Sequence, residues 1–375
     1  MKKLTIFIAA IALVCFAVPA MAADWNFYGS ARMATFYISD DYGDGTNAAG
    51  TDDSDAELQW EFQGNSRLGA RVKAESVSGR IELANTSDNT HDGGVFTRLL
   101  YGDWDFGAGK LRVGKAYTPT SQFISGQVFG ADLGMLGVGT NYGRRVPGLQ
   151  LMFGKFTVAL LEANDSNAGG WSTYADGDSD RFLPKLEAGW GMAFDTWNFN
   201  LMGGLQYVEV EDMPSAVDPG DSDDVDVTSY ILGADAGVNF GPAYVKTAFS
   251  FGQNWTNARW SDLAYSRSGA SSGAGLFDGD DDVDDSDNYQ VALVGGMKVS
   301  DMLQFEAGAG YRVADSDQDA VRKAEVWNVY GQAVIAMAPG VYVIPEAGYF
   351  DFGNDTAGDD QGKEFYLGAK WQIDF

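Results

Sequence analysis

Two short stretches contain residue types that could carry out nucleophilic catalysis. The segment GASSG (269–273) matches the Gly-x-Ser-x-Gly string of a nucleophile elbow, and the only histidine, His91, lies in the polar stretch TSDNTHDGG (86–94). A nucleophile elbow sits between a strand and a helix, whereas GASSG lies in a long stretch rich in Gly and Ser. A catalytic serine also needs a histidine beside it. We interpret GASSG as a chance match and His91 as a loop residue, so the sequence predicts a protein that is not an enzyme.

A second candidate for chemistry is the acidic run FDGDDDVDDSDN (277–288), which holds seven aspartates between Asp278 and Asn288. Clustered carboxylates are ligands for Ca²⁺, but Asp285 stands where the EF-hand turn requires glycine. We interpret the run as a solvated loop, with weak binding of divalent cations as the alternative. The sequence contains no Walker, Rossmann or zinc-ligand spacing, so it predicts neither a cofactor nor a metal site.

The first 22 residues are predicted to be a secretory signal peptide that is removed. Lys2 and Lys3 precede an apolar run from Leu4 to about Val18, and Ala20-Met21-Ala22 is typical of a cleavage site. The predicted mature domain is therefore 23–375. The only cysteine, Cys15, lies in the signal, so the mature chain has no thiol for a disulfide bond or a metal site.

The charge and the composition exclude several classes of protein. The formal net charge is −28, and it becomes −30 when the two lysines of the signal are removed. This acidity argues against a nucleic-acid partner, which requires a basic surface. Hydrophobic residues at 45% and aromatic residues at 13% argue against disorder. After the signal, no segment approaches the 18 consecutive apolar residues of a transmembrane helix.

The elements that must position any functional residue are predicted to be strands. In the closing stretch KEFYLGAKWQIDF (363–375), apolar side chains alternate with polar or small ones, and this period of two is typical of a strand with one apolar face. The same alternation recurs at 186–195, 230–240, 289–299 and 303–312. The second face of these strands is rich in Gly, Ala and charge, which favours a water-filled interior over a packed core.

The connections between the strands form two alternating classes. Seven are short, near 76–79, 107–109, 154–155, 196–198, 241–242, 300–301 and 338–340, and eight are long, near 39–56, 85–94, 118–139, 164–180, 211–226, 254–288, 315–323 and 353–362. They join sixteen strands. An even number of strands, with tight turns at one rim and long loops at the other, is typical of a transmembrane β-barrel. The predicted fold is all-β: a transmembrane antiparallel barrel of 16 strands, with short periplasmic turns and long extracellular loops. We expect the last strand to pair with the first, near Trp25–Tyr37, which removes the sheet edges that lipid would not tolerate.

Four stretches carry a resemblance to the trimeric, sixteen-stranded general porins of Gram-negative outer membranes. Gly368, Trp371, Ile373 and Phe375 resemble the terminal signal for barrel assembly, although Tyr366 departs from the polar or basic residue often found there. WNFYGSARM (25–33) resembles the first strand of this family, and GNSRLGARVKAE (64–75) resembles a later one. TRLLYGDWDFGAGKLRVGKAYTP (97–119) resembles the fourth and fifth strands, which lead into the third loop.

The resemblance implies that the third long loop, 118–139, folds into the barrel and narrows it. The composition of the loop agrees, because its single charge is Asp132, and a loop packed against a wall cannot carry many unpaired charges. An ordinary surface loop is the alternative. In the family, acids of this loop face arginines on the wall. Here Asp132 stands for the acid, and the wall residues are Arg32, Arg67, Arg71, Lys73, Arg80 and Arg98.

The function implied is that of an outer-membrane porin, a water-filled channel for passive diffusion of small hydrophilic solutes and ions. Its expected partners are outer-membrane lipid and lipopolysaccharide, the barrel-assembly machinery and two further copies in a homotrimer. Trp25, Phe27, Phe365 and Trp371 are candidates for the trimer interface, and lipid contact would explain them equally well. The alternatives are a plugged barrel with a structural or adhesive surface role and, further away, a barrel enzyme.

Overall fold

The computed structural model describes residues 23–41, 54–86, 94–164, 179–180, 182–214, 222–260, 273–277, 282–318, 323–354 and 358–375. The predicted signal 1–22, His91, most of GASSG and part of the acidic run 277–288 lie outside these residues. The strands are β1 (Asp24–Asp41), β2 (Ser54–Phe62), β3 (Arg67–Ala74), β4 (Val77–Asn85), β5 (Val95–Asp105), β6 (Lys110–Tyr117), β7 (Arg145–Phe153), β8 (Phe156–Leu161), β9 (Ser179–Asp180), β10 (Lys185–Ala193), β11 (Trp197–Pro214), β12 (Ser222–Phe240), β13 (Ala243–Gln253), β14 (Leu276–Phe277), β15 (Val283–Asp284), β16 (Ser286–Ser300), β17 (Leu303–Ser316), β18 (Ala324–Ala338), β19 (Val341–Asp351) and β20 (Lys363–Asp374).

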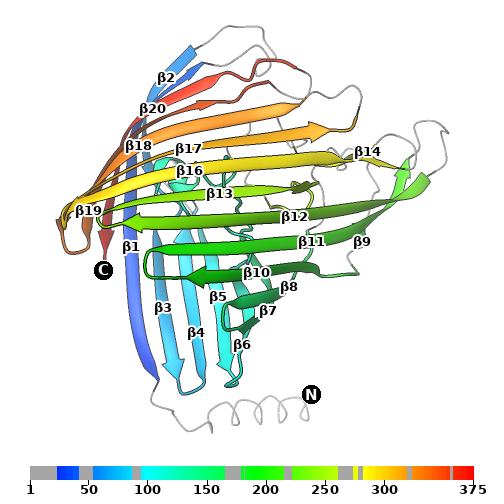
Figure 1. The fold of residues 1–375 in the computed structure, drawn as a ribbon, viewed down its shortest axis with the longest axis horizontal. Coiled ribbons are helices and arrows are strands. Elements are labelled where there is room, and N and C mark those ends of the chain that lie inside the picture. Colours follow the sequence, from blue (N-terminus) through cyan, green and yellow to red (C-terminus); the bar gives the residue numbers. More distant parts are fainter. Residues whose placement is uncertain are drawn as a thin grey trace, which may run out of the picture.

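In the described part of the chain, eighteen of these segments form one closed barrel of sixteen antiparallel strands (Figure 1), and β14 and β15 pair with each other in a separate two-stranded sheet. The sheet contains 18 segments because two of the strands are interrupted. β2 and β3 pair with successive halves of β1, so they are one strand broken at 63–66. β9 continues β10 along β11 in the same way. The predicted number of strands is confirmed, but the break at 63–66 was not predicted.

Pairing of the first and last strands closes the barrel, as the sequence predicted. β20 runs antiparallel to β1, from Ser30 opposite Asp374 to Asp41 opposite Lys363. On the other side of β1 lie β2 and β3. Pairing of β1 with β20 on one side and with β2 and β3 on the other therefore closes the sheet into a barrel, whereas the segments β2 and β9 are each paired on one side only, with β1 and β11.

The outer face of the barrel carries the apolar side chains that the period of two assigned to it. Trp25, Phe27, Leu367, Trp371 and Phe375 are all at least half exposed. Large apolar side chains exposed over a whole surface suit the hydrocarbon of a bilayer and not water. In the described residues, no helix is long enough and apolar enough to cross a membrane.

The third long connection lies inside the barrel. It runs from residue 118 to 144, contains the four-residue turn α2 (Phe129–Asp132), and appears in Figure 1 as the teal segment within the ring of strands. Val128, Phe129 and Val138 of this segment are buried against side chains of β1 and β18–β20. We call residues 118–144 the inner loop. Its inward position agrees with the sequence prediction, and it is five residues longer than expected.

Candidate functional site

Three buried glutamates of the barrel wall hold the backbone of the inner loop. Glu346 of β19 accepts the N–H groups of Val128 at 2.7 Å and Phe129 at 3.1 Å. Glu306 of β17 accepts the N–H of Gly126 at 2.7 Å. On the far side of the barrel, Glu187 of β10 accepts both the N–H of Thr120 at 3.1 Å and its hydroxyl at 2.8 Å. A loop buried in a barrel has no strand partner for its N–H groups, so these carboxylates supply the acceptors.

Aromatic packing fixes the middle of the inner loop against the same wall. The ring of Phe129 stacks on that of Tyr366, with centroids 3.8 Å apart and planes 7° apart. Phe36 of β1 meets both rings edge-on. The Tyr366 hydroxyl donates to Glu346 at 3.0 Å and accepts from Gln127 at 2.8 Å. Tyr366, the residue that departs from the family's terminal pattern, therefore has a local role in seating the loop.

Asp132 lies at the tip of the loop and is fully paired with the wall. Its carboxylate contacts Arg32 at 2.6 Å and Lys370 at 2.8 Å, and accepts from Asn65 at 2.5 Å. The backbone at Asp132 is left-handed (φ 67°), as it is at Ala131 (φ 58°). Two cations therefore balance the only acid of the inner loop. Asn65, which lies in the break between β2 and β3, donates a hydrogen bond to the Asp132 carboxylate, so the break positions a side chain that holds the inner loop.

A second carboxylate, Glu82 of β4, gathers three arginines on the neighbouring strands β3, β4 and β5 of the wall. Its fully buried side chain contacts Arg98 at 2.5 Å, Arg80 at 2.7 Å and Arg67 at 3.8 Å. It also accepts the Tyr28 hydroxyl at 2.7 Å. One carboxylate cannot neutralise three guanidinium groups, so this wall keeps an excess of positive charge.

Tyrosines separate these cations along the wall. Arg71 and Arg80 lie over the ring of Tyr28, at 5.1 Å and 5.3 Å from its centroid. Arg98 and Arg145 lie over Tyr117, each at 5.6 Å. Arg112 lies over Tyr101 at 4.0 Å and also pairs with Asp103 at 2.7 Å. Stacking on ring faces orients guanidinium groups without neutralising them.

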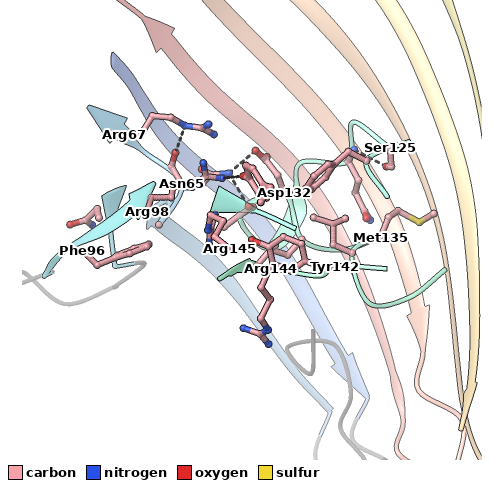
Figure 2. A pocket seen from close by; sticks show the side chains of 18 residues that line it. Asn65, Arg67, Phe96, Arg98, Ser125, Asp132, Met135, Tyr142, Arg144 and Arg145 are labelled. Atoms are coloured by element: carbon pink, nitrogen blue, oxygen red, sulfur yellow. Dashed lines mark hydrogen bonds between the residues drawn. The ribbon is translucent and has the colours of Figure 1, made fainter. Parts of the chain in front are cut away.

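Between the inner loop and this wall the barrel remains hollow. A cavity of about 440 Å³ is lined by Arg67, Arg98, Arg144 and Arg145, and among the described residues Asp132 is the only acid in its lining. Figure 2 shows Arg67, Arg98 and Arg145 on one side of Asp132, with Ser125 and Met135 of the inner loop on the other.

A second cavity of about 590 Å³ lies toward the short turns. Its charged lining residues are Arg112, Lys155, Asp235 and Lys246. Tyr117 and Phe123 line both cavities, so the two spaces meet at this pair of rings. The two rings contact each other edge-to-face, with centroids 5.1 Å apart, and we call the lumen space that they both line the aromatic passage.

A second segment, Asn254–Trp260, also folds into the barrel, and the sequence analysis did not predict it. Trp255 and Trp260 are completely buried. The Trp260 indole donates to Glu187 at 2.8 Å, so Glu187 holds this segment and the inner loop together. At its base Asn254 donates to Asp285 at 2.6 Å; burial raises the pKa of Asp285, and this hydrogen bond acts against the shift. Two tryptophans in the stretch NWTNARW (254–260) of a polar loop were the available signal.

The structure brings together five of the seven residues predicted to form the constriction. Asp132 and Arg32 form an ion pair, and Arg67, Arg80 and Arg98 surround Glu82. Arg71 and Lys73 share the lumen face of β3 but lie nearer the short turns, where Lys73 is exposed opposite Asp24. Residues that contact the site without having been predicted are Glu82, Lys370, Arg144, Arg145, Phe123 and Glu346.

The four residues predicted to form the assembly signal lie on β20 and just beyond it. Trp371, Ile373 and Phe375 point outward and are exposed. Gly368 faces the lumen, where a side chain would collide with the Thr35 carbonyl, 2.1 Å from the position of a Cβ atom. Glycine there permits close pairing with β1. Among the residues with described positions, no group of three or more His, Cys, Asp or Glu side chains could hold a metal ion.

Comparisons with known proteins agree with this architecture. Residues 9–266, more than half of the chain, match the model of a family described as Gram-negative porin. No curated protein matches the chain at a significant level.

Among solved structures, the outer membrane channel DcaP of Acinetobacter baumannii is similar at a TM-score of 0.70 and 15% identity, covering 94% of this chain and 97% of that one. An anion-selective porin from Comamonas acidovorans is similar at a TM-score of 0.59 and 13% identity, covering 94% and 100%. The trimer form of OmpT from Vibrio cholerae gives 0.54 and 17% identity, covering 93% and 99%.

Proposed function

Because this chain belongs to the Gram-negative porin family, it is an outer-membrane channel for passive diffusion, and we propose that its narrowest part prefers anions. The observation that carries this proposal is the lining of the cavity beside the inner loop. Of the described residues that line it, four are arginines and one, Asp132, is an acid, which is already paired with Arg32 and Lys370. Rings of arginine favour anions in pores, so the field at the constriction opposes cations.

The acidity of the whole chain does not contradict this proposal. The net charge of −28 comes largely from long loops such as 277–288. At physiological ionic strength, salt screens exposed charges beyond about 8 Å. Ions inside a narrow passage respond chiefly to the charges that line it, because the low-dielectric wall focuses their field. We therefore propose that the acidic loops influence which ions enter the channel, whereas the arginines influence which ions pass through its narrowest part.

The inner loop is proposed to set the size limit. Contacts with β10, β13, β17, β19 and β20 hold it across the lumen, and we propose that the aromatic passage between the loop and the arginine wall is the route for solutes. Transport of this kind involves no bond making, so we propose that the protein is not an enzyme. Asp132, Arg32, Arg67, Arg80 and Arg98 are proposed to form the constriction, with Arg71 and Lys73 below it.

We also propose a homotrimer. The Vibrio cholerae structure is a trimer form, and here exposed Trp25, Phe27, Phe365 and Trp371 provide an apolar outer surface that a second copy could cover. Lipopolysaccharide and the barrel-assembly machinery are proposed as further partners, on the basis of the outer-membrane location and of the terminal residues Gly368, Trp371, Ile373 and Phe375.

The deciding experiment is conductance of the purified protein in a planar lipid bilayer across a gradient of KCl. We expect a reversal potential that shows anion preference. Arg67→Gln should weaken that preference, because Arg67 lines the cavity and forms the longest of the Glu82 ion pairs, 3.8 Å. Lys73→Gln removes the same charge from an exposed position near the rim and should change it less.

Cation preference in the unmodified channel would contradict the proposed selectivity. Barrels that insert and carry no current would instead favour a plugged barrel with a structural role. The inward segment Asn254–Trp260 is the specific feature that would favour that second candidate.

A further inference from the structure

We propose that the cavity on the long-loop side of the aromatic passage is a weak binding site for aromatic carboxylates. This inference rests on the proposed anion channel and adds a solute class to it. Phe123 is the first observation. Its ring is 53% exposed although it lies inside the barrel on the inner loop. An apolar ring facing a wet lumen is unfavourable unless another surface covers it.

The neighbours of Phe123 form an aromatic corner. Its ring meets Tyr117 edge-on at 5.1 Å and Tyr142 edge-on at 6.2 Å. Aromatic pairs at these separations favour offset or edge-to-face contacts. A planar ring entering the cavity can therefore cover Phe123 while meeting at least one tyrosine. A saturated ring of similar size buries similar area but lacks the polarised edge and face that these contacts use.

Arg145 supplies the charge for such a solute. Its guanidinium lies over Tyr117 at 5.6 Å and over Tyr142 at 5.9 Å, at the same corner of the cavity. Among the described residues, no carboxylate pairs with Arg145, whereas Arg67 and Arg98 share Glu82. A planar guanidinium with available N–H donors binds a carboxylate through two parallel hydrogen bonds. The stacking on two rings holds it in position for this.

The cavity also has the size and polarity of a solute site. Its volume is about 440 Å³, and Asn65, Ser125 and Gln127 add polar groups to its lining. Ligand pockets typically measure a few hundred Å³ and combine apolar surface with few polar groups. Affinity has to stay modest, because a solute that binds tightly in a diffusion channel is not released. We expect half-saturation of benzoate in the millimolar range.

The test is single-channel recording with three probes of similar size: benzoate, cyclohexanecarboxylate and benzyl alcohol. Benzoate should interrupt the current at a concentration about three- to tenfold lower than cyclohexanecarboxylate, the range given by aromatic pairing. Benzyl alcohol, which lacks the charge, should not interrupt it. Phe123→Leu should remove the difference between the two acids, and Arg145→Gln should weaken benzoate at least tenfold. Arg112→Gln, in the other cavity, is the matched control and should leave benzoate unchanged.

Equal interruption by benzoate and cyclohexanecarboxylate, or an unchanged benzoate response in Phe123→Leu, would overturn the proposal. Insertion of each variant with conductance close to wild type shows that it has folded. The KCl reversal potential of the same channels distinguishes failure of the binding site from failure of the anion selectivity. Anion preference without any difference between the probes would contradict only the binding site. Cation preference would contradict the proposed selectivity as well.

Discussion

Glu82 determines how three arginines face the lumen. It is completely buried, and its two oxygens serve Arg67, Arg80, Arg98 and the Tyr28 hydroxyl. Burying cations costs free energy unless an anion lies beside them. The arginine wall therefore depends on one buried acid, whose charge offsets only part of the positive charge of the three arginines.

Glu82→Gln should destabilise the barrel and increase its anion preference. The amide keeps one acceptor oxygen but loses the charge, so we expect a loss of about 1–3 kcal/mol in the free energy of unfolding. Urea unfolding followed by tryptophan fluorescence and the KCl reversal potential would measure the two effects. Asp301→Asn is the control: Asp301 also pairs with a cation, Lys298 at 2.7 Å, but at an exposed turn, where the loss should be much smaller than for Glu82→Gln. Equal losses in the two variants would contradict the role given to Glu82.

Ala131 occupies a left-handed conformation (φ 58°, ψ 39°) that suits glycine better. Ala131→Gly should therefore stabilise the protein by up to about 1 kcal/mol. Ala131→Val should destabilise it, because a β-branched side chain tolerates this conformation less well than alanine does. Urea unfolding of both variants checks the sign. A destabilising glycine would show that the turn at Asp132 is not under backbone strain.

At the scale of elements, the inner loop is held mainly by wall carboxylates. Glu346 accepts two of its N–H groups and the Tyr366 hydroxyl. Glu346→Leu would leave these donors without an acceptor, each at a cost of about 1–3 kcal/mol. We expect the loop to leave the wall part of the time, giving noisier and larger single-channel currents. Tyr366→Phe removes the two hydrogen bonds of the hydroxyl, to Glu346 and from Gln127, but it keeps the stacking and both backbone N–H bonds of Glu346, so its currents should stay close to wild type. Quiet, unchanged currents in Glu346→Leu would show that Glu306 and Glu187 are sufficient.

The strands could be predicted from the sequence because one face of each strand contacts lipid and must be apolar. Periodicity in Leu367, Trp371 and Ile373 identifies such a face directly, and the low charge of residues 118–139 indicated the inner loop. The lumen side gives no such signal. In the sequence, Glu82, Glu187 and Glu346 cannot be distinguished from other polar residues that face water. Their structural roles depend on partners that are distant in the sequence. The segment Asn254–Trp260 was hidden for a related reason, since a loop's direction depends on tertiary contacts that tryptophans alone do not specify.

For the whole molecule, an acidic exterior surrounds a basic constriction. The chain carries −28 overall, yet four arginines line the cavity beside the inner loop. Raising KCl from 0.1 M to 1 M shortens the screening length from about 10 Å to about 3 Å. We expect the ratio of anion to cation permeability to fall over this range but to remain above one, because the lining residues act within a few ångströms of a passing ion. Reversal potentials at fixed concentration ratio would measure it. A change of sign at high salt would indicate that the preference comes from distant surface charge.

The pairing of β1 with β20 has a consequence for the order of biosynthesis. Ser30 finds its partner in Asp374, at the opposite end of the chain. One side of β1 therefore has no hydrogen-bonded neighbour until β20, which follows all the other strands of the barrel, has been made and exported. Such contacts between remote parts of a chain form slowly, and an unpaired strand edge meanwhile invites association with other chains. Until β20 arrives, this edge of β1 can pair with other chains, and pairing with β20 ends that exposure.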